Sequence, residues 1–176
     1  MKPIQLKNNN LRLVYILLMG LLFSCKTTSH NKQLDSNTSV IITADEIIFE
    51  YHDASVPPDD HRSYFIQIRE DSLFYSVDSY GEIIKKNSIA IDLKKWNSIK
   101  NAFVSCGIKN IEERKISEGC TGGTGNSISA YVKKEQLFKG YQYRCSNYFD
   151  GDLDGDLNGF LMTIKQDIDP VFFSTD

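Results

Sequence analysis

Hydrophobic and polar residues alternate along several short stretches of the chain. A period of two residues is typical of strands that bury one face and expose the other. Segment 64–69 is the clearest example, because Tyr64, Ile66 and Ile68 occupy alternate positions in it. Strands are predicted over residues 47–52, 64–69, 73–77, 83–91, 128–132 and 138–144.

Turn-forming residues separate these strands. The Pro-Pro pair at 57–58 ends the first strand, because proline removes a backbone donor and fixes the backbone. Glu70-Asp71 predicts the turn of a hairpin, and Tyr80-Gly81 predicts the next turn. The glycine-rich segment 119–125 lacks the lysine and hydroxyl that follow a phosphate-binding loop, so it is predicted to be a flexible loop.

Two other stretches repeat apolar residues at intervals of three and four, which is typical of amphipathic helices. The clearer one covers residues 93–106, with Asp92 placed to cap its start and Gly107 to end it in a left-handed conformation. Trp96 lies on its apolar stripe and is predicted to anchor the helix on the sheet. A short closing helix is predicted over residues 160–168.

The order strands, helix, strands, helix favours an α+β fold. We expect an antiparallel sheet of hairpins, with one main helix and a short C-terminal helix packed on one face. Residues 42–173 are predicted to form this single domain, since that length is ample for one core and short for two.

The N-terminal residues have the layout of an export signal. Lys2, Lys7 and Arg12 are followed by the apolar run 13–23, and no acidic residue is present. The run is about 11 residues, or roughly 16 Å as a helix, against a hydrocarbon core of roughly 30 Å. The pattern therefore disfavours a permanent membrane span.

The apolar run ends in Leu22-Phe23-Ser24-Cys25, which resembles the lipobox of bacterial lipoproteins. The resemblance implies that residues 1–24 are a signal peptide, that the Cys25 thiol receives diacylglycerol, and that the new amine is acylated, for example with palmitate. It implies a cell-envelope protein, lipid-anchored to a bacterial membrane, without selecting the inner or the outer one. An ordinary secretory signal, with Cys25 as a bystander, is the alternative.

Composition and charge extend this picture. Residues 25–41 are mostly polar and are predicted to form a flexible tether between the lipid and the domain. Removal of residues 1–24, which hold three basic and no acidic residues, changes the formal charge from −3 to −6. An acidic domain lacks the basic surface of nucleic-acid binding proteins, so no nucleic-acid partner is expected.

Three cysteines are present besides Cys25: Cys106, Cys120 and Cys145. The oxidising compartment that the lipobox implies favours disulfides. Cys120 and Cys145 lie in predicted loops, whereas Cys106 lies on the apolar stripe of the main helix, where a free thiol behaves as a small hydrophobe. The sequence therefore predicts a Cys120–Cys145 disulfide, worth roughly 3 kcal/mol in the chain-entropy model, and a free Cys106.

An acidic segment near the C-terminus matches the opening D-x-D-x-D-G of a calcium-binding loop. The twelfth position from Asp150 is Leu161, however, where such loops carry a bidentate glutamate. Turns and a helix cap are the alternative explanation of these aspartates. Calcium is the only cofactor that the sequence suggests. Its predicted ligands are Asp150, Asp152, Asp154 and Asp156.

No motif of a metalloprotease, nucleophile elbow or dinucleotide site is present, so we expect the protein not to be an enzyme. Cys120 as a nucleophile would need a nearby histidine. His52 and His61 flank the Pro-Pro segment with two aspartates and are predicted to be solvated rather than to share a metal.

The leading hypothesis is a non-catalytic binding domain with a protein or peptide partner. Its strands are rich in tyrosine, a residue enriched at interfaces. A calcium-binding envelope module is the alternative. The tyrosines that motivate the leading hypothesis are Tyr131, Tyr141, Tyr143 and Tyr148.

Overall fold

The computed structural model describes residues 36–115, 122–146, 148–166 and 168, all within the compact unit formed by residues 34–176. The predicted signal peptide, the lipobox and Cys25 lie outside these residues. Within the ranges described, no helix is long and apolar enough to cross a membrane.

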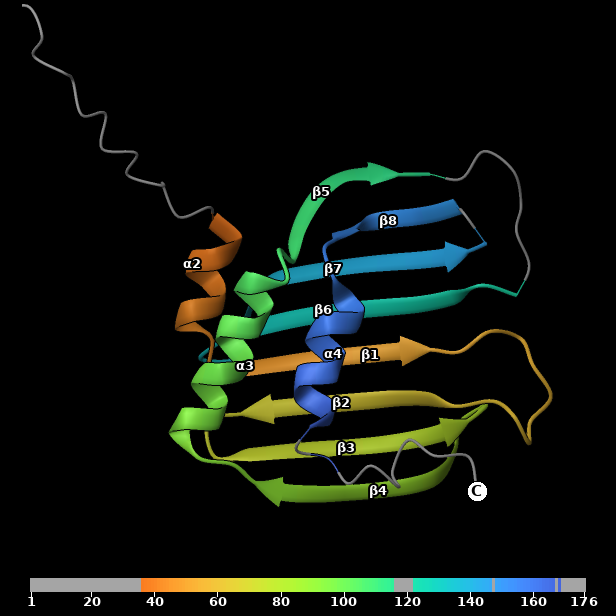
Figure 1. The fold of residues 1–176 in the computed structure, drawn as a ribbon, viewed down its shortest axis with the longest axis horizontal. Helices are drawn as coiled ribbons and strands as arrows, with labels where there is room; N and C mark the ends of the chain where they lie inside the picture. Colours follow the sequence, from red (N-terminus) through yellow and green to blue (C-terminus); the bar gives the residue numbers. More distant parts are fainter. Residues whose placement is uncertain (1–35, 116–121, 147, 167, 169–176) are drawn as a thin grey trace, which may run out of the picture. The chain divides into compact units, whose positions relative to one another are not determined.

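Eight antiparallel strands form one sheet in the order β4-β3-β2-β1-β6-β7-β8-β5 (Figure 1). Two meanders meet at the centre, where β1 pairs with β6, and the connection through α3 runs from one edge of the sheet to the other. The strands are β1 (Glu46–His52), β2 (Ser63–Arg69), β3 (Ser72–Ser79), β4 (Glu82–Ala90), β5 (Lys109–Arg114), β6 (Thr124–Val132), β7 (Glu135–Cys145) and β8 (Tyr148–Asp154).

The described part of the chain contains three helices: α2 (Ser36–Thr43), α3 (Leu93–Ser105) and α4 (Leu157–Lys165). In Figure 1, α3 and α4 lie side by side in front of the strands, and residues of α3 contact both α2 and α4. The predicted α+β class with an antiparallel sheet is therefore confirmed.

Strand alternation supplies one side of the hydrophobic core. In β1, Ile47 and Phe49 are 0% exposed, whereas the residues that alternate with them, Glu46, Ile48 and Glu50, are half-buried. Helix α3 contributes Trp96, Ile99 and Phe103, whose spacing puts them on one helical face. Phe103 meets Phe160 of α4 with ring centroids 5.7 Å apart and nearly perpendicular planes, so both helices share this core with the sheet.

The ends of α3 follow the sequence prediction. The Asp92 Oδ1 accepts a hydrogen bond from the Lys95 N–H at 2.7 Å and so caps the N-terminus. Gly107 has a φ of +64° directly after the C-cap Cys106, as expected of a left-handed terminator. Trp96 is 3% exposed, which confirms its role as a core anchor.

Three features differ from the predictions. Residues up to 41 were expected to be a flexible tether, but Ser36–Thr43 forms α2 and Ile41 is 0% exposed, because the apolar residues of this segment have a core to join. Strand β5 was not predicted, since only one of its six residues is strongly apolar. Strand β8 was not predicted either and replaces the expected acidic loop.

Candidate functional site

The aspartates proposed as calcium ligands do not form a loop. Asp150, Asp152 and Asp154 belong to β8, so the predicted acidic loop is wrong over these positions. Asp152 bonds to the neighbouring strand: its Oδ1 accepts the backbone N–H of Tyr141 at 2.8 Å. The carboxylate accepts this N–H directly after Gly151, which has a φ of +113° and is the last residue of β8 that pairs with β7.

Asp156 has the alternative role that the sequence offered. It is the N-cap of α4, and its Oδ1 accepts the backbone N–H of Gly159 at 2.8 Å. Among the residues described, no group of three or more histidine, cysteine or acidic side chains has the geometry of a metal site. Calcium binding by Asp150, Asp152, Asp154 and Asp156 stays a prediction.

Asp156→Ala is expected to lower the free energy of unfolding by about 1 kcal/mol, because it removes the cap of α4. Asn158→Ala, an exposed change in the same helical turn, should alter it by less than about 0.5 kcal/mol. Urea unfolding of both variants in calcium and in chelator measures the two effects. A loss for Asp156→Ala that occurs only with calcium would identify a ligand instead of a cap.

The cysteines are partly outside the described chain. Cys145 is 7% exposed and is disulfide-bonded. Cys120, its predicted partner, lies outside the described residues, so the Cys120–Cys145 pairing stays a prediction. Cys106 is a half-buried free thiol next to the core, and burial raises its pKa above the usual value. A raised pKa keeps this thiol protonated and unreactive at neutral pH.

His61 is not the solvated side chain that the sequence predicted. It is 6% exposed because its ring stacks on Tyr80, with centroids 4.1 Å apart. The ring nitrogens lie 3.4 Å from the Tyr80 backbone nitrogen and 3.4 Å from the Ser63 hydroxyl. These contacts fix a turn against the sheet, whereas His52 at the end of β1 is exposed as predicted.

Tyrosines cover two of the glycines that the sequence assigned to a flexible loop, Gly123 and Gly125. Gly125 lies within β6, and the Tyr141 hydroxyl would be 3.3 Å from a Cβ at that position. The Gly123 N–H donates to the Tyr143 hydroxyl at 3.0 Å, and a Cβ there would be 2.6 Å from that oxygen. The glycines thus leave room for aromatic rings to lie across the neighbouring strand.

We call the side of the sheet that bears these rings the tyrosine face. On β1 it carries the residues that alternate with core-facing Ile47 and Phe49. Tyr141 is 40% exposed, and Tyr148, whose Cα pairs with that of Cys145, is 59% exposed. Further members of this face, all half-buried, are Ile48, Phe65, Phe74, Tyr131 and Tyr143.

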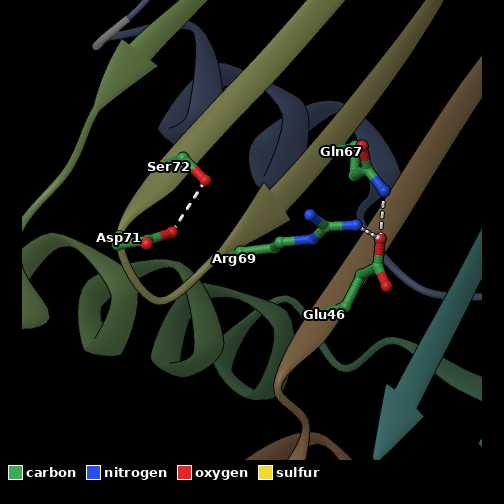
Figure 2. Close-up of polar contacts among 5 residues, drawn as sticks. All are labelled: Glu46, Gln67, Arg69, Asp71 and Ser72. Atoms are coloured by element: carbon green, nitrogen blue, oxygen red, sulfur yellow. Dashed lines mark hydrogen bonds and ion pairs between the residues drawn. The ribbon is translucent and has the colours of Figure 1, made fainter. Parts of the chain in front are cut away.

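A polar cluster borders this face on β1 and β2. Figure 2 shows Glu46 accepting hydrogen bonds from the Gln67 amide and from the Arg69 guanidinium, the latter at 3.2 Å. The Arg69 side chain is 55% exposed, so solvent screens the ion pair and its contribution is small. Local sequence does not distinguish these residues from other polar positions, because only the strand register brings them together.

Comparison of the chain with protein-family models, with curated proteins and with solved structures found no match.

Proposed function

We propose that this chain is a lipid-anchored, non-catalytic binding domain of a bacterial cell envelope, which binds a protein or peptide partner through the tyrosine face. Cys25 would carry the lipid, and the domain would act outside the cytoplasm. The observation that carries the proposal is the exposure of Tyr141 and Tyr148 on the side of the sheet away from the core.

Physical chemistry supports a partner on this face. A tyrosine contributes a large rigid apolar surface and one hydroxyl, at a low cost in side-chain entropy. Exposed aromatic groups that share one surface have a lower free energy when a partner covers them than when water does. Ile48, Phe65 and Phe74 extend the apolar area across the sheet, and the rings of the two phenylalanines lie 6.2 Å apart.

Photocrosslinking in cells tests the proposal with a matched control. The photoreactive residue p-benzoylphenylalanine is placed at position 148, or at Met162 on α4, which has the same 59% exposure as Tyr148. We expect one discrete crosslinked species from position 148 and none from position 162. Identical patterns at both positions, or no product at 148, would reject the tyrosine face as the binding surface.

The anchor is tested separately. Cys25→Ser should abolish incorporation of labelled palmitate and move the protein from the membrane fraction to the soluble fraction, because the acyl chains would be lost. Absence of label from the unmodified protein would show that Cys25 is a bystander in an ordinary signal, and labelling that persists in the variant would place the lipid on another residue. Either result would leave the crosslinking test of the tyrosine face unaffected.

A further inference from the structure

A second surface lies on the core side of the sheet, at the N-terminus of α4. Four neighbouring strands each place one residue in a single row across the sheet. Tyr51 pairs with Tyr64 on one side and with Asn126 on the other, and Asn126 pairs in turn with Gln142. All four residues line a pocket of about 480 Å³, within the range of roughly 300–1,000 Å³ typical of small-ligand sites.

Strand alternation makes this row unusual. Asn126 shares its face of β6 with Ile128 and Ala130, which are both 0% exposed in the core. Tyr51 follows Ile47 and Phe49 of β1 in the same way. The pattern that builds the core therefore continues beyond α4 with polar and aromatic side chains, at positions where folding alone would favour apolar ones.

Several polar groups of the pocket have no partner in the described chain. The amides of Asn126 and Asn158 and the hydroxyl of Thr124 make no hydrogen bond within it, nor do the two terminal amino groups of Arg144. Arg144 is held in place, because its Nε donates to the Gln142 Oε1 at 3.0 Å. Gln142 is 2% exposed, and its Nε2 donates to the Leu153 carbonyl at 3.1 Å.

The aromatic side of the pocket is equally ordered. The rings of Tyr51 and Tyr64 stack with centroids 4.6 Å apart and an angle of 19° between their planes. The Tyr51 hydroxyl donates to the Asp53 Oδ1 at 3.2 Å. Burial, followed by the charge of Asp53, raises the pKa of Tyr51 to about 12, so its hydroxyl stays protonated at neutral pH.

The chemistry of the lining selects the ligand class. One cationic side chain, Arg144, and one anionic side chain, Asp156, border the pocket, so no net charge favours an ion. Amides and hydroxyls both donate and accept hydrogen bonds, which suits a ligand whose own groups do both. The flat ring of a tyrosine suits a ligand whose own ring has an apolar face. The polar lining disfavours a lipid tail.

We propose that this pocket binds an uncharged saccharide, with a sugar ring packed against Tyr51 and its hydroxyl groups bonded to Asn126, Arg144 and Asn158. The site lies on the side of the sheet opposite the tyrosine face, so it is independent of the proposed partner surface.

Calorimetric titration of the full-length protein with a neutral trisaccharide of glucose, and with one of N-acetylglucosamine, tests the proposal. At least one should bind with a Kd of about 1 mM or tighter. Asn126→Ala and Arg144→Gln should each weaken binding by about tenfold, since each removes ligand hydrogen bonds. Asn97→Ala, an exposed change on α3, should leave the Kd unchanged.

Thermal unfolding of each variant separates loss of binding from loss of fold. Arg144 is exposed, so Arg144→Gln should not disturb folding. This variant keeps the test decisive if Asn126→Ala does not fold. Failure of both trisaccharides to bind would overturn the proposal. A Kd that neither pocket variant changes would overturn it too. Binding of inorganic phosphate in place of the trisaccharides, lost in Arg144→Gln, would show an anion site and would also overturn it.

Discussion

Gly151→Ala should lower the free energy of unfolding by about 3–5 kcal/mol, the largest effect we expect from a single added methyl group. Gly151 has a φ of +113°, a conformation that side chains with a Cβ rarely adopt. The added Cβ would also collide with the carbonyl group of Tyr141, whose carbon would lie 2.9 Å away. Gly151 and Tyr141 both lie in paired parts of their strands, so neither strand can move without losing hydrogen bonds of the sheet.

Gly81→Ala provides the matched control for this change. Gly81 has a φ of +89°, but a Cβ there would meet no atom within 4 Å. The control therefore carries backbone strain without a collision and should cost about 1–2 kcal/mol. Urea unfolding followed by circular dichroism gives both values. Equal losses in the two variants would mean that the close approach of β7 and β8 contributes nothing.

Phe160→Ala is expected to lower the free energy of unfolding by about 3–5 kcal/mol, because it leaves a cavity where the sheet, α3 and α4 meet. Phe160 is 0% exposed, and its ring lies 6.2 Å from that of Phe49 and 5.7 Å from that of Phe103. The change should reduce the denaturant midpoint without changing the slope, because the surface exposed on unfolding stays similar.

Met162→Ala tests whether this loss comes from packing or from the helix itself. Met162 is two positions further along α4 and is 59% exposed, and alanine is at least as good a helix former as methionine. The change should stay within about 0.5 kcal/mol. A loss for Met162→Ala as large as that for Phe160→Ala would show that α4 does not depend on its buried face.

The sequence predicted the elements whose local signals agree with their tertiary environment. The helix with Asp92, Trp96 and Gly107 has a cap, an apolar stripe and a terminator, and each was found in its expected role. The turn at Tyr80-Gly81 was also correct, since both residues have the positive φ of a tight hairpin turn.

The missed elements lack such agreement. Strand β8 is rich in aspartate and glycine, which are depleted in strands, and it forms because β5 and β7 pair with it on both sides. Strand β5 lies at an edge, where few apolar residues are needed. Helix α2 is short and contains β-branched residues, so its helical propensity is low, yet Ile41 is buried.

The pocket beside α4 could not be predicted from local sequence at all. Tyr51, Asn126 and Gln142 are ordinary residues in their own segments, and the row that they form exists only through strand register. The sequence did identify the tyrosines of the opposite face, because a local excess of one residue type is visible without knowledge of pairing.

The central pairing of β1 with β6 has a consequence for how the protein folds and misfolds. The meanders β1–β4 and β6–β8 are each built from strands that follow one another in sequence. The hydrogen bond between Glu50 and Ser127 across the central pairing, in contrast, spans 77 positions. Closing so long a loop costs entropy before any contact compensates for it, so the central pairing should be slow to form. Until it forms, or whenever it opens, β1 and β6 both present unpaired edges. An acyl anchor would concentrate such molecules in the plane of a membrane, where exchange of meanders between neighbouring copies would be the favoured route to aggregation.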